Sequence, residues 1–298
     1  MSFDPQAHRQ ASLDSWEAAA SGWVRQQDRM RSFAAPVSHW LIDALALQPG
    51  QRVLELASGI AETGLLAAEL VAPGGSVIIS DQAEAMLDGA RARAEQLGIA
   101  NVEFKVLNAE WIDLPVASVD AVLCRWGYML MADPVAALGE TRRVLSPGGS
   151  VALSVWDAIE HNPWAAVPAR ELIERGIVPP PQRPSAEQSA AADGPFAGGA
   201  PGPFAIADRE RLAKLLDDAG FTDVQIDAVE LTRREHSFDA MWQSTLDISP
   251  SFHNAVMSQP AGEVDEIRSG LQARLEPFTA ADGTLALPGR ALVASASA

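Results

Sequence analysis

Residues 52–70, RVLELASGIAETGLLAAEL, constrain the fold more than any other stretch of the chain. Val and Leu dominate residues 52–57, the short apolar run expected of a buried strand in a parallel sheet. Small residues follow, and from residue 62 to 71 apolar side chains return at helical spacing. A strand that passes through a small-residue turn into a helix lets backbone N–H groups approach a ligand, and the helix N-terminus adds partial positive charge. The stretch therefore predicts a ligand-binding cradle.

Two classes of ligand use such a cradle. A dinucleotide site has the pattern G-x-G-x-x-G, whose positions here would be Ala57, Gly59 and Glu62. The glutamate would sit where the helix must press on the strand, near a pyrophosphate. The second pattern is an acidic residue inside the strand followed by glycine-like residues at every second position. Glu55, Ala57, Gly59 and Ala61 fit it, with alanine replacing glycine twice.

The chain after the cradle continues to alternate strand and helix. Short apolar runs that predict strands cover residues 76–80, 102–107, 118–124 and 150–156. Ser146–Gly149 (SPGG) predicts a turn into the last of these runs. Regular alternation is typical of a doubly wound parallel sheet, in which ligands lie beyond the carboxyl ends of the strands. Asp81, Asn108 and Arg125 fall at such ends.

Asp81 has two interpretations. A carboxylate at the tip of the second strand can accept hydrogen bonds from both hydroxyl groups of a ribose. The alternative is that Asp81 caps the helix that follows, a position for which aspartate is also preferred. We favour ribose binding because position and chemistry coincide.

The segments outside this core have a different character. Residues 1–31 carry Trp16 and Trp23 at helical spacing, whereas residues 157–207 are rich in Pro, Gly and Ala. So long a structureless stretch is a lid or a linker, and its place after the fifth strand favours a lid. We expect four parts: an N-terminal helical cap (1–48), a ligand-binding core (49–156), the lid or linker (157–207), and a C-terminal part (208–298) that completes the core and carries a helical insertion (238–280).

Composition narrows the class of protein. The formal net charge of −17, without a cluster of Lys and Arg, argues against a nucleic-acid or anionic-membrane partner. No apolar run approaches membrane-spanning length and the N-terminus is polar, so we expect no membrane segment and no signal peptide. The single cysteine, Cys124, excludes an internal disulfide and fits a cytoplasmic location. The five histidines lack metal-ligand spacing, so we expect no metal.

A wider resemblance joins the cradle to the segment that follows. Residues 119–156, VDAVLCRWGYMLMADPVAALGETRRVLSPGGSVALSVW, together with residues 52–70, resemble the class I S-adenosyl-L-methionine (SAM)-dependent methyltransferases. Within that class they look like the ubiquinone/menaquinone biosynthesis C-methyltransferase group (methyltransferase type 11 like). The resemblance covers residues 50–160, and the outer segments look like a divergent bacterial subgroup. It implies a Rossmann-like α/β fold with a doubly wound seven-stranded sheet, SAM as cofactor, and S-adenosyl-L-homocysteine (SAH) as its product.

The resemblance also implies roles for individual residues. The residues that it implies for binding the cofactor are Glu55, Ala57, Ser58, Gly59, Asp81, Gln82, Asn108, Ala109, Glu110 and Arg125. Asn108 stands where the family usually has aspartate. Its amide oxygen can accept from an adenine amino group without the charge; the alternative is a loop residue bonding its own backbone. An apolar or aromatic acceptor pocket would be lined by Trp16, Trp23, Trp126, Tyr128 and Trp164, and filling the core is the alternative for these side chains.

The chemistry of the expected reaction needs few special groups. Displacement at a sulfonium depends on alignment, which is worth roughly 7–11 kcal/mol in well-oriented cases. If the acceptor is a hydroxyl or an acidic carbon, a general base helps, and His161 is the candidate; a solvated loop histidine is the alternative. We therefore expect methyl transfer to a small apolar or aromatic acceptor. A SAM-binding subunit without catalysis and a nicotinamide-dependent oxidoreductase remain as alternatives, and the aromatic outer helices make a homodimer plausible.

Overall fold

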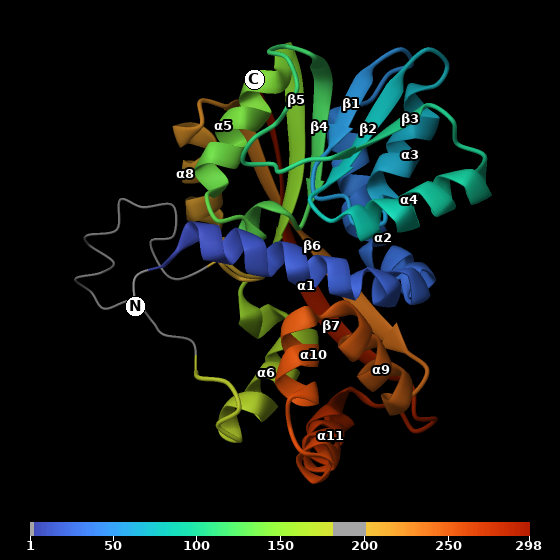
Figure 1. Ribbon diagram of the computed structural model, residues 1–298, viewed down its shortest axis with the longest axis vertical. Coiled ribbons are helices and arrows are strands. Elements are labelled where there is room, and N and C mark those ends of the chain that lie inside the picture. Colours follow the sequence, from blue (N-terminus) through green and yellow to red (C-terminus); the bar gives the residue numbers. More distant parts are fainter. Residues whose placement is uncertain (1–2, 181–200) are drawn as a thin grey trace.

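A seven-stranded mixed sheet forms the centre of the molecule (Figure 1). The computed structural model describes residues 3–180 and 201–298, so part of the expected lid or linker, residues 181–200, lies outside the described residues. The strands are β1 (Arg52–Glu55), β2 (Ser76–Asp81), β3 (Val102–Val106), β4 (Val119–Arg125), β5 (Leu145–Trp156), β6 (Thr222–Glu235) and β7 (Leu285–Ser297). Their order is β3-β2-β1-β4-β5-β7-β6. The first five are parallel, and β7 runs antiparallel to β5 and β6. The predicted fold class is confirmed.

Helices cover the sheet in two groups. The helices are α1 (Pro5–Arg25), α2 (Gln27–Leu45), α3 (Glu62–Val71), α4 (Glu84–Leu97), α5 (Pro134–Val144), α6 (Pro163–Glu174), α8 (Arg209–Asp218), α9 (Phe238–Ile248), α10 (Pro250–Met257) and α11 (Ala261–Leu275), with short 3₁₀ turns at Tyr128–Leu130, Ile159–His161 and Glu276–Phe278. Helices α2 and α3 pack on each other and on the sheet, and α5 and α8 form a second such pair. The strands β1, β2 and β4 are almost entirely buried, as the uninterrupted apolar runs of a parallel sheet require, whereas β3 and most of β6 are half-buried or exposed.

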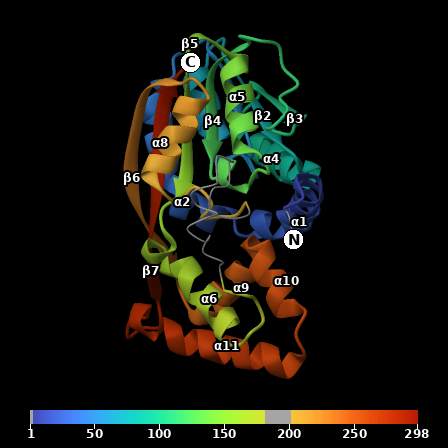
Figure 2. The same ribbon diagram turned by 90° about the vertical axis from the view of Figure 1, so that its left-hand side faces the viewer.

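A second layer of helices lies beyond the carboxyl ends of the parallel strands (Figures 1 and 2). Helices α6, α9, α10 and α11 bury a hydrophobic core of their own with the start of β7, which includes Trp242, Phe252 and Leu271. The long strands β6 and β7 run from the sheet into this layer, and α1 lies between the sheet and the helical layer (Figure 2). The carboxyl edge of the sheet is therefore enclosed rather than open to solvent.

Two local expectations were wrong. Residues 163–174, expected to be structureless, form α6, which begins at Pro163, an ordinary first residue of a helix. The turn expected at Ser146–Gly149 lies within β5: Val119 pairs with Leu145, but Ala121 pairs with Ser150, so the extra residues bulge from the strand. Ser146–Gly149 pair with neither β4 nor β7, and Gly148 has a φ of +81°, so the turn residues form the bulge while the pairing of Leu145 extends the strand before them.

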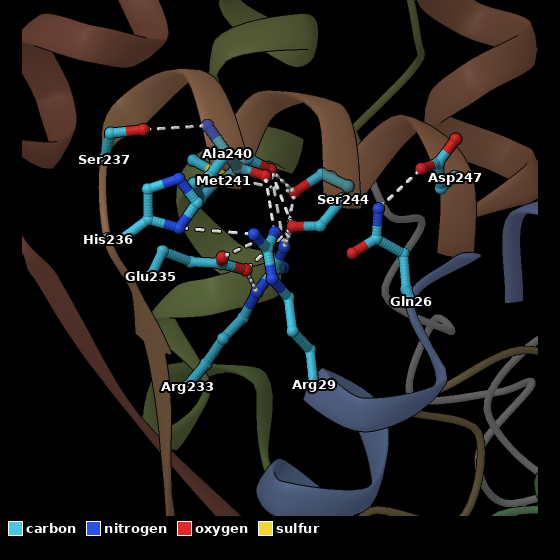
Figure 3. Close-up of polar contacts among 11 residues, drawn as sticks. Gln26, Arg29, Arg233, Glu235, His236, Ser237, Ala240, Met241, Ser244 and Asp247 are labelled. Atoms are coloured by element: carbon cyan, nitrogen blue, oxygen red, sulfur yellow. Dashed lines mark hydrogen bonds and ion pairs between the residues drawn. The ribbon is translucent and has the colours of Figure 1, made fainter. Parts of the chain in front are cut away.

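A buried polar network ties α2, β6 and α9 together (Figure 3). Arg233 donates to Ser244 Oγ at 2.5 Å, to Thr245 Oγ1 at 3.0 Å and to Glu235 Oε1 at 3.1 Å. Arg29 of α2 approaches the other oxygen of Glu235 at 3.1 Å. Because Arg233 and Glu235 are each 5% exposed, either charge alone would be strongly destabilising. This network fixes the helical layer relative to the sheet.

Candidate functional site

The cradle between β1 and α3 has the alternating backbone that its sequence suggests. Ala57, Gly59 and Ala61 all lie in the left-handed region, with φ of +49°, +54° and +63°. An alanine is less stable there than a glycine, because its Cβ crowds the following carbonyl. The methyl of Ala57 has room because Gly127, after β4, lacks a side chain: a Cβ there would lie 2.8 Å from that methyl. The replacement of glycine at residue 57 is thus matched by a glycine opposite.

Asp81 connects the end of β2 to the cradle. Its Oδ2 accepts a hydrogen bond from the N–H of Gly59 at 2.8 Å, and its Oδ1 accepts one from the N–H of Ala83 at 3.0 Å. Burial raises the pKa of Asp81, and these backbone N–H groups lower it. Both interpretations of Asp81 therefore have a physical basis, since it faces the cradle and also fixes the turn before α4.

Two further titratable groups at the cradle are buried without full hydrogen bonding. Among the described residues, Glu55 Oε2 and Arg125 Nη1 have no hydrogen-bond partner. Burial raises the pKa of Glu55 to about 8, while Arg125 and the N–H of Gly64 lower it. Gly64 leaves the space for this carboxylate, since a Cβ there would lie 2.2 Å from Oε2. Buried polar atoms normally find partners, so the pair is suited to a ligand that carries both an ammonium and a carboxylate.

A cavity of about 630 Å³ lies beside the cradle, between α1 and the ends of β2 and β3. Gln82, Leu107 and Asn108 line it from the sheet, and Arg9 and Leu13 line it from α1. Such a volume is in the usual range for small-molecule sites, roughly 300–1,000 Å³. It lies at the carboxyl edge of the sheet, where the ligands of doubly wound folds bind.

Helix α1 covers the cradle from outside (Figure 1). A Cβ built on Gly59 would lie 4.0 Å from Trp23 Cε3, so the Trp23 ring lies over the cradle glycine. Trp16 packs edge-on against Trp23 with ring centroids 5.8 Å apart. Glu17 accepts from the first two N–H groups of α4, at 2.6 and 3.2 Å, which the helix's own N-cap residue leaves without a side-chain partner. The helix therefore encloses the cradle.

The loop after β3 is bound to α1 and to itself. Asn108 Oδ1 accepts from the N–H of Glu110 at 2.8 Å, the loop contact that was the alternative for this residue. Glu110 Oε2 accepts from Arg9 Nε at 2.9 Å, and its Oε1 accepts from the N–H of Ala132 at 2.8 Å. Ala109 is 8% exposed. Contacts of Asn108, Ala109 and Glu110 with a cofactor thus remain predictions.

An aromatic cluster lies at the carboxyl ends of β4 and β5. Trp126 and Trp156 stack with centroids 4.2 Å apart, and Trp164 of α6 lies 4.7 Å from Trp156. Phe33 of α2 packs against all three. Trp126 has a φ of +60°, rare for a bulky residue, and its buried Nε1 has no partner among the described residues. Backbone strain and a free donor in one side chain are features that concentrate at functional sites.

The five predicted acceptor residues lie in three places. Trp126 and Trp164 belong to the aromatic cluster, whereas Trp16 and Trp23 lie on α1 over the cradle. Tyr128 is 1% exposed, and its hydroxyl lies 2.6 Å from Thr141 Oγ1. Phe33 was missed, because its helix lies far away in sequence and nothing local distinguishes it from a core residue.

His161 is held between two charged side chains. Its Nδ1 lies 3.3 Å from Asp157 Oδ2 and 2.5 Å from Arg290 Nη2. Arg290, on β7, also donates to Asp157. Neither partner was predicted from the sequence. Asp157 directly follows the fifth strand, a position that often carries site residues, but Arg290 comes from an antiparallel strand near residue 298.

Comparison with known proteins identifies the domain. A family model described as a methyltransferase domain matches residues 47–175. A demethylmenaquinone methyltransferase from Thermus thermophilus is 37% identical over 41% of this chain and 56% of its own length. The chain spans about half the length of the curated relatives it matches. Among solved structures, YcgJ from Bacillus subtilis has a TM-score of 0.55 at 17% identity, covering 87% of this chain and 97% of that one. The [4+2]-cyclase SpnF has a TM-score of 0.50 at 17% identity, covering 88% and 80%.

Residues 47–175 match a methyltransferase domain, and the seven-stranded fold is that of the class I SAM-dependent methyltransferases. Within the class this domain is related to the ubiquinone/menaquinone biosynthesis C-methyltransferases. SAM is the cofactor of the class, and the site fits it. The unpartnered Glu55 and Arg125 match the ammonium and carboxylate of its amino-acid part, and Asp81 lies beside the cradle as a ribose-binding carboxylate would.

Two further absences concern the described residues only. No helix within residues 3–180 and 201–298 is long and apolar enough to cross a membrane. In the same part of the chain, no group of three or more His, Cys, Asp and Glu side chains is arranged to hold a metal ion.

Proposed function

We propose that this chain transfers the methyl group of SAM to a small acceptor with a flat aromatic or conjugated ring. The observation that carries the proposal is the aromatic cluster beside the cradle, in which Trp126 Nε1 is buried without a partner. A flat ring would stack on Trp126 and Trp156, as aromatic rings do, and a carbonyl or hydroxyl oxygen on it would accept from Nε1. The related C-methyltransferases, named for ubiquinone and menaquinone biosynthesis, support this class of acceptor.

The protein contributes to the reaction by aligning the acceptor with the methyl group of SAM and by excluding water from the cradle. SAM supplies the electrophilic methyl group. Glu55 and Arg125 bind its amino-acid part, and Asp81 orients the ribose. Helix α1, fastened by Arg9 to Glu110, keeps water from the cradle. Holding the reacting atoms in line in this way is the main source of rate enhancement in such displacements.

His161 is proposed as the general base when the acceptor is a hydroxyl or an acidic carbon. Asp157, beside Nδ1, would stabilise the imidazolium that forms, and Nε2 would accept the proton once Arg290, which lies 3.0 Å from Nε2, has moved away. With an acceptor that needs no base, the three side chains would serve to shape the wall of the pocket.

Binding of the cofactor is tested by calorimetry with SAH. We expect a dissociation constant in the micromolar range, about −8 kcal/mol. Replacing Asp81 by Ala should abolish binding, whereas Asp88→Ala, an exposed aspartate paired with Arg91, should leave it unchanged. If SAH does not bind even at about millimolar concentration, the SAM-dependent proposal is rejected.

Methyl transfer is tested with labelled SAM and a panel of quinones, phenols and amines. Methylation of a flat ring compound supports the proposal. Binding of SAH without transfer to any of them would favour a non-catalytic SAM-binding subunit, an alternative that the alanines at residues 57 and 61 also support. Fluorescence transfer from bound NADH would instead favour the oxidoreductase alternative.

Cytoplasmic location, lack of a nucleic-acid partner and a homodimer stay predictions. The first two rest on the charge of −17 and the single cysteine. Light scattering on the purified protein measures the third directly, and a monomer at all concentrations would refute it.

A further inference from the structure

A second cavity, of about 390 Å³, lies between α2, α3 and the end of α4. It shares no lining residue with the cavity beside the cradle. Leu65, Leu66 and Ile99 form an apolar wall, and Glu62 lines the cavity from the first turn of α3. The volume is sufficient for a small metabolite.

Glu62 is an unusual residue for such a place. It is only 8% exposed, and its Oε1 has no hydrogen-bond partner among the described residues. Carboxylates are seldom buried unless they are paired. Burial raises the pKa of Glu62, and Arg125, Arg31 and Arg93 lower it, although none of the three forms an ion pair with it in the part of the chain described. The wall of the cavity therefore holds a buried carboxylate oxygen that has no donor among the described residues.

Two positively charged side chains, Arg31 and Arg93, line the same cavity. Arg31 is already paired with Asp28 at 2.9 Å. Arg93 donates to the neutral Gln96 at 3.3 Å and forms no ion pair within residues 3–180 and 201–298. A carboxylate and a guanidinium thus line one small, partly apolar space without contacting each other.

We propose that this cavity binds a small zwitterion with an apolar side chain, of the size of a free leucine or methionine. The ammonium group would bind Glu62, the carboxylate would bind Arg93, and the side chain would lie on Leu65 and Leu66. A simple amine would leave the guanidinium unpaired, and a simple carboxylic acid would leave Glu62 unpaired. Only a ligand with both charges satisfies both groups.

The position of Glu62 couples this site to the cradle. Glu62 directly follows Ala61, the last left-handed residue of the cradle, and its charge acts on the same Arg125 as that of Glu55. Pairing Glu62 with an ammonium group changes the field at Arg125. By reciprocity, the zwitterion and the cradle ligand must then change each other's affinity by the same factor. The site is independent of the proposed methyl transfer.

The test is a titration of the full chain, with SAH in excess so that the cradle is occupied. The probes are L-leucine, L-methionine, 3-methylbutylamine, which lacks the carboxylate of leucine, and 4-methylpentanoate, which lacks its ammonium. We expect saturable binding of at least one amino acid, at least about tenfold tighter than either of the last two compounds. Glu62→Gln and Arg93→Gln should each weaken that binding about tenfold or more, and Glu95→Gln, exposed on α4 outside the cavity, should not.

Circular dichroism and SAH calorimetry on each variant show whether it folds. Arg93→Gln, on a half-buried residue, keeps the test valid if Glu62→Gln does not fold. The proposal is overturned if neither amino acid binds at about 20 mM, if the amine or the acid binds as tightly, or if the folded variants bind like the parent. None of these results depends on methyl transfer. If the parent chain does not bind SAH, the same titration is read without it.

Discussion

The buried carboxyl of Glu55 should make the stability of the protein fall as the pH rises. Its pKa is raised from 4.5 to about 8, mainly by burial, so the folded state retains a proton that the unfolded state loses. Below about pH 4.5 both states are protonated and there is no penalty. Above that, stability falls with pH until the folded carboxyl also ionises near pH 8.

The size of the effect follows from the slope. One unit of pKa difference corresponds to 1.36 kcal/mol, so between about pH 5.5 and about pH 7.5 this carboxyl alone removes about 2.7 kcal/mol from the free energy of unfolding. Glu55→Gln keeps the shape of the side chain but cannot titrate. The variant should therefore lack this part of the pH dependence.

Urea denaturation of the parent, Glu55→Gln and Glu95→Gln at several pH values measures the effect. The difference in unfolding free energy between the parent and Glu55→Gln should change by about 2.7 kcal/mol across that interval, in the direction that favours the variant at high pH. The Glu95→Gln control should run parallel to the parent. If Glu55→Gln also runs parallel, the carboxyl of Glu55 is ionised in the fold and the argument from burial fails.

Three other substitutions follow from contacts in the structure. Arg233→Met removes the buried cation of Glu235 and leaves only the more exposed Arg29 beside it, so it should cost about 3–5 kcal/mol in urea denaturation. Arg234→Met, on the exposed side of β6, should cost less than about 0.5 kcal/mol, and equal costs would contradict the network in Figure 3. Trp126→Phe removes an unsatisfied buried donor, so the free energy of unfolding should stay the same or rise by up to about 1–3 kcal/mol. The KM for a ring acceptor should rise in the same variant. A loss of stability with unchanged KM would refute the role assigned to Trp126. Gly127→Ala would place a Cβ 2.6 Å from Cys124 Sγ and 2.8 Å from Ala57, so calorimetry should show SAH binding at least about tenfold more weakly. Gly139→Ala, whose Cβ would have nothing within 4 Å, is the control and should bind SAH like the parent.

The sheet was predictable because its signals are local and repeated. Buried parallel strands have continuous apolar runs, and each of the first five except β3 is followed by a helix, so the order of elements could be inferred from spacing. The left-handed residues at Ala57 and Ala61 could also be anticipated, because the pattern of alternate glycine-like positions survives the two substitutions.

The contacts that complete the site could not be predicted. Arg9 meets Glu110, and Arg290 meets His161, across 101 and 129 residues of sequence. Such pairs depend on where α1 and β7 lie in three dimensions, and a lone arginine on a helix or strand gives no sign of its partner. The bulge in β5 was missed for a related reason, since it depends on the pairing of Leu145 with Val119 of β4, which the local turn residues Ser146–Gly149 do not reveal.

The position of α1 has a kinetic consequence. The helix is anchored near its start by Arg9 to the loop after β3 and at its end by Arg25, which binds Asp247 of α9 at 2.7 Å. Because Trp23 lies over the cradle, we expect a ligand to enter it only after some of these contacts open. At high cofactor concentration the rate of association is then set by opening of the helix and reaches a plateau, and the bound cofactor leaves no faster than the helix opens.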